Sequence, residues 1–252
     1  MKAWRIWILP VVCVFGFAGI VATASNQAWF VFLNKIGPLT SEFLWANITV
    51  LGDTLVAFAL CLALWRRRPD LVWALVFTAL LATLWAQGLK HLVEVARPPA
   101  VMPELVVIGP PYRAGSFPSG HATTAFAVAG LVALGIRCWI LAGTALFLAI
   151  AVAVSRAVVG VHWPLDILAG AFGGWLCAAA GLWLGQRTLA FGLKPWVQWT
   201  LGGLLILCSA VLVYGHRSGY PQADFLQRTI GLASLLFAGA RLIRDFRRRP
   251  GL

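Results

Sequence analysis

Long apolar runs separated by short polar connections make up almost the whole chain. The runs cover residues 6–24, 43–65, 71–89, 121–136, 138–155, 164–185, 197–214 and 225–243. Most are close to the roughly 20 residues that a helix needs to cross a bilayer. No internal repeat or low-complexity linker interrupts them. The pattern therefore predicts an all-α, polytopic membrane helix bundle of eight helices, folded as a single domain over residues 1–252.

Composition supports a membrane protein. Hydrophobic residues make up 61% of the 252 and charged residues only 11%, whereas about 25% of a soluble domain is charged. The beginning of the chain leaves one alternative open. Lys2 and Arg5, an apolar stretch and then Ala22-Thr23-Ala24 also resemble a cleavable secretory signal. The run is long enough to span a membrane, which favours an uncleaved first helix.

The net charge of +12 would suggest a nucleic-acid partner in a soluble protein, but here the basic residues follow membrane topology. With a cytoplasmic N-terminus, thirteen of the 20 lysines and arginines fall on the inner side, as the positive-inside rule requires. They are Lys2, Arg5, Arg66, Arg67, Arg68, Arg137, Arg187, Lys194, Arg241, Arg244, Arg247, Arg248 and Arg249. This distribution predicts a plasma (inner) membrane protein with both termini in the cytoplasm and no nucleic-acid partner.

Four short motifs hold ionisable residues where such groups are costly, at the ends of apolar runs. They are Lys90 with Arg97-Pro98, then Pro118-Ser119-Gly120-His121, then Ser155-Arg156, and finally His162 four residues before Asp166. In the predicted topology all four lie at the outer ends of their helices. The topology therefore predicts one extracytoplasmic, periplasmic site assembled from distant segments.

The first three motifs suit a phosphate group. Ser119 is a natural N-cap, and the free N–H groups of a helix N-terminus bind anions. Gly120 lets the backbone approach a phosphoryl oxygen, and the cations of Lys90, Arg97 and Arg156 can neutralise its charge. If the third helix continued past Lys90, two turns would bring Arg97 to the same side, before Pro98 ends the helix.

The histidines complete the roles that phosphoryl transfer needs. Asp166 can accept a hydrogen bond from one nitrogen of His162 and leave the other nitrogen free to attack phosphorus. His121 then remains as the proton donor. No cluster of carboxylates and no cysteine spacing typical of a metal site is present in the sequence. The expected enzyme uses no metal and no cofactor.

At these residues the chain resembles the type 2 phosphatidic acid phosphatase superfamily, integral membrane lipid phosphatases related to vanadium-dependent haloperoxidases. The superfamily pattern is Lys, six residues, Arg-Pro; Pro-Ser-Gly-His; and Ser-Arg, five residues, His, three residues, Asp, and every specified position is matched here. The resemblance implies a six-helix core over about 1–190, with two extra transmembrane helices over about 195–245. It also implies that His162 is the nucleophile, His121 the general acid and Asp166 the residue that orients the nucleophile. Phosphate-binding roles are implied for Lys90, Arg97, Ser119, Gly120 and Arg156.

Two further places are ambiguous from sequence alone. Asp53 could steady a cation of the site or simply cap a helix. The turn between the two extra helices is expected to be a plain solvated loop, with substrate gating as the alternative. It contains His216, Arg217, Tyr220, Asp224 and Arg228.

Three functional hypotheses follow. The first is a membrane hydrolase that acts on a lipid phosphate or diphosphate, such as undecaprenyl diphosphate, phosphatidylglycerophosphate, phosphatidic acid or lipid A phosphate. The second is a lipid phosphotransferase with the same phosphohistidine intermediate. The third is a non-catalytic transporter, which would not require a pair of histidines. Nothing in the sequence distinguishes the headgroups or indicates an oligomeric state.

Overall fold

The computed structural model describes residues 4–102 and 104–247. Over these residues every regular element is a helix and there is no strand, so the predicted all-α fold is confirmed. Lys2, Arg248 and Arg249, which the sequence assigns to the cytoplasmic side, lie outside the described residues.

The helices follow one another with short connections, except between α8 and α9. The first half contains α1 (Trp4–Ala22), α2 (Asn26–Asn34), α3 (Ile36–Leu39), α4 (Glu42–Val50), α5 (Thr54–Cys61), η1 (Leu62–Leu64), α6 (Pro69–Thr83), η2 (Leu84–Gly88), α7 (Leu89–Val93) and α8 (Pro98–Val101). The second half contains α9 (Gly120–Gly135), α10 (Trp139–Val158), α11 (Pro164–Arg187), α12 (Leu189–Gly192), α13 (Pro195–Tyr214), η3 (Pro221–Ala223) and α14 (Asp224–Arg247).

All eight predicted helices are present, but they are less uniform than their apolar runs. Among the described residues, four helical stretches are long and apolar enough to cross a membrane, or up to six if each of two bent pairs counts as one span. The run predicted as one helix over 43–65 is such a pair, because α4 and α5 meet at 61°. The Asp53 carboxylate accepts the N–H of Leu55 at 2.8 Å and starts a new helix there. Helix α9 has only 16 residues. Helix α14 is not among the stretches that are long and apolar enough to cross a membrane.

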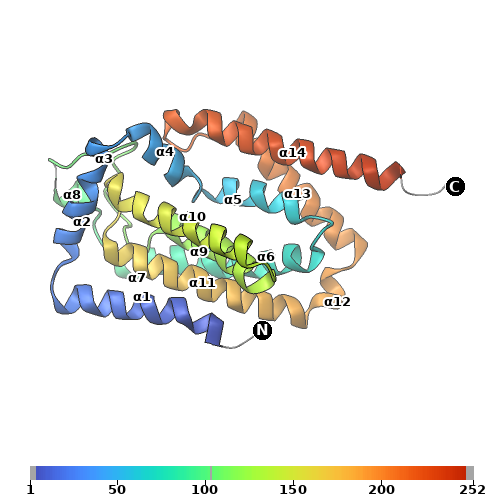
Figure 1. Ribbon diagram of the computed structural model, residues 1–252, viewed down its shortest axis with the longest axis horizontal. Coiled ribbons are helices and arrows are strands. Elements are labelled where there is room, and N and C mark those ends of the chain that lie inside the picture. Colours follow the sequence, from blue (N-terminus) through green and yellow to red (C-terminus); the bar gives the residue numbers. More distant parts are fainter. Residues whose placement is uncertain (1–3, 103, 248–252) are drawn as a thin grey trace.

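Helix α11 occupies the middle of the bundle and packs against α9, α6 and α1, while α13 packs against α14 and α5 (Figure 1). Glycines allow the close approach of α11 to α9. A β-carbon at Gly170 would overlap the carbonyl oxygen of Ser119, and one at Gly174 would overlap that of Thr123. Small residues at such crossings let helix backbones approach in a membrane. The start of α9 is thereby held against the start of α11.

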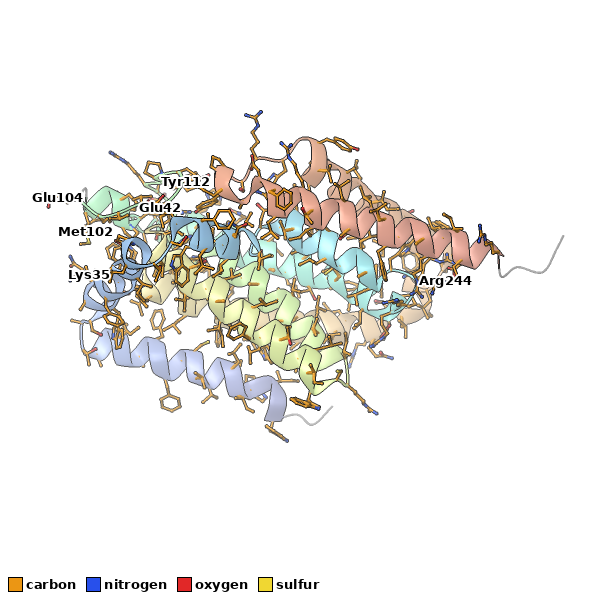
Figure 2. All side chains as sticks on the ribbon, turned by 45° about the horizontal axis from the view of Figure 1, so that its top comes forward. Lys35, Glu42, Met102, Glu104, Tyr112 and Arg244 are labelled. Carbon is orange, nitrogen blue, oxygen red and sulfur yellow. The ribbon has the colours of Figure 1, made fainter. Side chains whose placement is uncertain are left out.

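The two ends of the bundle differ in their charged residues. Arg66 donates to Asp245 at 2.6 Å, and Arg68 donates to the carbonyl of Gly135 at 3.0 Å. The start of α6 and the ends of α9 and α14 therefore lie at the same end of the bundle. Arg244 lies at this end, whereas Lys35, Glu42 and Tyr112 lie at the opposite end (Figure 2). The start of α1 and the end of α14 point away from the end that carries α2, α3 and α8 (Figure 1).

Candidate active site

The four motifs meet around one cavity of about 440 Å³. Seven of the nine residues that the sequence singled out line it, namely Asp53, Lys90, Arg97, Gly120, His121, Arg156 and His162. The other two, Ser119 and Asp166, are buried next to it and hold its walls in place. Segments more than 100 residues apart in the sequence thus form a single site.

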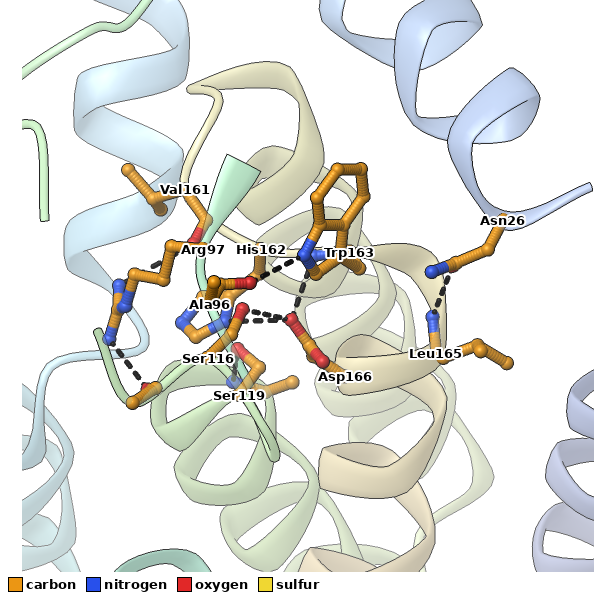
Figure 3. Close-up of polar contacts among 12 residues, drawn as sticks. Asn26, Ala96, Arg97, Ser116, Ser119, Val161, His162, Trp163, Leu165 and Asp166 are labelled. Carbon is orange, nitrogen blue, oxygen red and sulfur yellow. Dashed lines mark hydrogen bonds and ion pairs between the residues drawn. The ribbon is translucent and has the colours of Figure 1, made fainter. Parts of the chain in front are cut away.

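His162 is fixed from both its backbone and its ring. Its N–H donates to the carbonyl of Arg156 at 3.2 Å, and its ring Nδ1 lies 3.4 Å from Oδ2 of Asp166. The same carboxylate oxygen accepts the N–H of Trp163 at 2.8 Å and the hydroxyl of Ser116, as Figure 3 shows. With Nδ1 directed at Asp166, the other ring nitrogen, Nε2, is the one available for chemistry.

His162 sits in the connection between α10 and α11, where it is 1% exposed. Burial, and then the positive charges of Arg97, Arg156 and Lys90, lower the pKa of His162 well below its ordinary value of 6.5. The imidazole is therefore neutral at pH 7, which is the form a nucleophile requires.

Asp166 and Trp163 also explain why α11 begins where it does. Trp163 is the N-cap, Pro164 takes the first helical position, and Asp166 in the first turn accepts the N-cap N–H. The carbonyl of Asp166 accepts the N–H of Ser119 at 3.0 Å. One short sequence therefore starts a helix, orients His162 and attaches the start of α9.

The start of α9 has the predicted form. Ser119 is its N-cap, with the hydroxyl oxygen accepting the N–H of Ala122 at 3.4 Å. Among the described residues, no heavy atom outside the local backbone lies within 4 Å of the position that a β-carbon on Gly120 would take. An oxyanion can therefore approach this backbone. Ser119 itself is fully buried and is not among the cavity residues, so its phosphate contact stays a prediction and its observed role is capping.

Arg97 reaches the cavity by a different route from the one expected. Helix α7 ends at Val93, and Glu94 adopts a left-handed conformation with φ of 33°, so the third helix does not continue through Arg97. The N–H of Arg97 donates to the carbonyl of Arg113 at 2.9 Å. Its guanidinium donates to the carbonyls of Ala114 at 2.9 Å and Gly115 at 3.2 Å. Loop carbonyls, and not helical spacing, bring Arg97 beside Lys90.

Arg156 is 2% exposed in the last turn of α10. Its Nη1 donates to the hydroxyls of Thr49, at 2.6 Å, and Tyr220, at 3.2 Å. Neither partner belongs to a motif. Thr49 and Ser116 were not predicted from the sequence, and Tyr220 was named only as part of the turn between the two extra helices. Hydroxyl residues without a spacing signal cannot be singled out before the segments are placed in space.

Asp53 caps a helix, one of the two roles that were open for it, and steadying a cation of the site stays a prediction. One carboxylate oxygen caps α5 through Leu55, and the other lies 2.9 Å from Nε2 of His216, which also lines the cavity. The expectation of a plain solvated loop for the turn between α13 and α14 is wrong at Tyr220, which is 3% exposed. The turn packs onto the site because the aromatic ring of Tyr220 joins the hydrophobic cluster that contains Ile108 and Val161.

Comparisons with known proteins identify relatives of this chain. The family model of the PAP2 superfamily matches residues 71–190. An undecaprenyl-diphosphatase of Sulfolobus acidocaldarius is 31% identical over 156 residues, which cover 61% of this chain and 68% of that protein. A lipid A 1-phosphatase of Rhizobium etli is 40% identical over 81 residues, which cover 32% of this chain and 34% of that protein.

Two solved structures share the fold. LpxE of Aquifex aeolicus superimposes with a TM-score of 0.58 at 27% identity, over 62% of this chain and 94% of that one. A transmembrane PAP2 type phosphatidylglycerolphosphate phosphatase from Bacillus subtilis gives a TM-score of 0.53 at 22% identity, over 74% of this chain and 98% of that one. Motifs, matched residues and shared fold lead to one conclusion. The chain belongs to the PAP2 superfamily.

Proposed function

We propose that the chain hydrolyses a membrane lipid phosphate or diphosphate through a phosphohistidine intermediate, at a site open to the extracytoplasmic side. The names of its relatives support a hydrolase and suggest undecaprenyl diphosphate and lipid A phosphate as the first substrates to examine.

The observation that carries this proposal is the two-part character of the cavity. One part holds His121, His162 and the three cations, while the other is walled by apolar and small residues of α5, α6 and α9. These wall residues include Phe58, Leu75, Ala79, Ala82, Ala127, Val128 and Leu131. A substrate with a charged headgroup and a hydrocarbon tail fits both parts, and the tail stays away from water.

In the first step, Nε2 of His162 attacks phosphorus and forms a P–N bond. The bond from phosphorus to the leaving oxygen breaks, and that oxygen takes a proton from His121. For a monoester the leaving group is a lipid alcohol, and for a diphosphate it is a lipid monophosphate. Lys90, Arg97, Arg156 and the N-terminus of α9 neutralise the charge on the non-bridging oxygens.

In the second step, water attacks the phosphohistidine and gives a proton back to His121. The P–N bond breaks, and inorganic phosphate leaves. Asp166 stabilises the positive charge that the imidazole ring of His162 carries in the intermediate, because its carboxylate lies against Nδ1. The cations and the nucleophile come from the protein itself, which supports a mechanism without a metal ion.

The charge pattern supports an extracytoplasmic site. The basic residues that meet at the far end of the bundle, including Arg66, Arg68 and Arg244, are those the positive-inside rule assigns to the cytoplasm. The histidines and cations of the motifs lie toward the other end, where Tyr112, which also lines the cavity, is found. In a background without the five native cysteines, Ala114→Cys should react with an impermeant thiol reagent in intact cells. Arg137→Cys, an exposed position near the basic end, is the matched control and should react only after lysis. The reverse pattern would refute the orientation.

Substrate turnover is the direct test of the function. Purified protein in detergent should release inorganic phosphate from at least one lipid among undecaprenyl diphosphate, phosphatidylglycerophosphate, phosphatidic acid and lipid A 1-phosphate, and His162→Ala should not. Release without any lipid acceptor distinguishes hydrolysis from phosphotransfer. Absence of release from the whole panel by folded wild-type protein would overturn the proposal.

A further inference from the structure

The turn between α13 and α14 reaches the phosphate-binding part of the cavity from outside the matched family region. Both α13 and α14 lie beyond residue 190, where the match to the family model ends. The hydroxyl of Tyr220, at the end of this turn, lies 3.2 Å from Nη1 of Arg156. A segment added to the superfamily core thus touches one of the cations of the site.

Close packing fixes Tyr220 in this place. The aromatic ring covers Gly109, where φ is +86° and a β-carbon would overlap the ring. Its backbone N–H donates to the hydroxyl of Ser218 at 3.3 Å, and the amide of Gln227 donates to the same hydroxyl at 2.7 Å. The turn is therefore braced both by the loop before α9 and by α14.

The contacts of Arg156 show what the hydroxyl does. A guanidinium has five N–H donors, two of them on Nη1. Thr49 and Tyr220 take both donors of Nη1. The buried Nε has no hydrogen-bond partner among the described residues, although a buried donor normally has one. Because two hydroxyls hold one side of the guanidinium plane, its other donors are left for an anion in the cavity that Arg156 lines.

We infer that Tyr220 is a positioning residue for Arg156. Its hydroxyl fixes the guanidinium in the orientation that binds phosphoryl oxygens, so the phosphate-binding site of this chain is complete only with the α13–α14 turn. The inference rests on the proposed function, since it assigns a phosphoryl group to Arg156. Like Tyr220, Thr49 lies outside the matched residues 71–190, but only Tyr220 lies beyond the six-helix core expected over about 1–190.

Tyr220→Phe is the sharp test because it removes the oxygen and keeps the ring that covers Gly109. A hydrogen bond to a charged group that is lost on substitution lowers affinity by roughly tenfold or more. We expect vanadate affinity, measured by calorimetry, and kcat/KM for the lipid substrate each to fall by roughly tenfold. Tyr214→Phe, at an exposed position near the end of α13, is the matched control and should change neither value.

A double-mutant cycle separates positioning from general stability. With Arg156→Lys as the second change, Tyr220→Phe should lower vanadate affinity by less than about twofold, because the planar guanidinium that it orients is gone. The melting temperature of Tyr220→Phe should match that of Tyr214→Phe. Equal losses in both backgrounds, a melting temperature that falls together with activity, or unchanged vanadate affinity would each overturn the inference.

Vanadate binding also keeps this test apart from the test of the proposed function. If wild-type protein releases no phosphate from any lipid, the proposed function fails. The calorimetric comparison still measures whether Tyr220 acts on an oxyanion through Arg156, because it requires no turnover.

Discussion

Replacing Ser116 by alanine tests how the carboxylate of Asp166 is held. The hydroxyl of Ser116 donates to Oδ2 of Asp166, the oxygen that also accepts the Trp163 N–H and faces Nδ1 of His162. Ser116 is fully buried, so water does not replace the lost donor without rearrangement. The substitution should therefore loosen the group that orients the proposed nucleophile.

The structure sets the expected magnitude. A hydrogen bond to a charged group contributes about 1.5–3 kcal/mol, and each 1.4 kcal/mol in the barrier corresponds to about tenfold in rate. Because the Trp163 N–H at 2.8 Å remains, we expect the lower end of this range. Ser116→Ala should lower kcat roughly tenfold with KM nearly unchanged. Asp166→Asn should lower kcat by roughly 100-fold or more, because it removes the charge that stabilises the imidazolium.

The assay is steady-state phosphate release by purified variants. Ser209→Ala is the matched control, since Ser209 is also a fully buried serine but donates only to the carbonyl of Leu205 within α13. If Ser116→Ala kept the kcat of Ser209→Ala while Asp166→Asn lost activity, the Ser116 bond would have no part in orienting His162. The reasoning from the three contacts on Oδ2 would then be refuted.

Three further predictions concern pH, Asp53 and metals. The acid limb of kcat/KM should lie below pH 6.5, since the lowered pKa of His162 keeps its imidazole neutral as the pH falls. Lys90→Gln removes one of the positive charges that lower this pKa, so it should move the acid limb to higher pH. An acid limb that stays in place would contradict the assignment of His162 as nucleophile. Asp53→Asn should keep the melting temperature of the wild type, because asparagine caps a helix as well as aspartate does. Asp53→Ala should lower the free energy of unfolding by about 1 kcal/mol. Equal melting temperatures for the two variants would argue against the capping role. Turnover should persist in excess chelator and should be inhibited by vanadate. Activity that is lost in chelator and restored by magnesium or zinc would contradict the metal-free mechanism.

The sequence predicted the parts of this molecule that depend on short spacings. Apolar runs identified the helices because burial in lipid requires a long uninterrupted stretch. The separation of four residues between His162 and Asp166, and the cap at Ser119, are local and appear as expected.

Features that depend on distant contacts could not be predicted in this way. The bend at Asp53 lies within an apolar run and depends on packing of Gly52 against the start of α9, where a β-carbon would overlap His121. The placement of Arg97 comes from carbonyls of residues 113–115. The contact of Tyr220 with Arg156 spans 64 residues. No spacing rule connects such positions.

The most direct measurement of the central claim is chemical trapping of the phosphoenzyme. Purified protein is mixed with substrate labelled in the phosphoryl group and quenched within milliseconds. Wild-type protein should carry acid-labile, base-stable label, as expected of phosphohistidine. His121→Ala should still trap label from p-nitrophenyl phosphate, whose leaving group needs no proton, while it slows with a lipid substrate. His162→Ala should trap none. Label on His162→Ala at the wild-type level would contradict the mechanism proposed for this site.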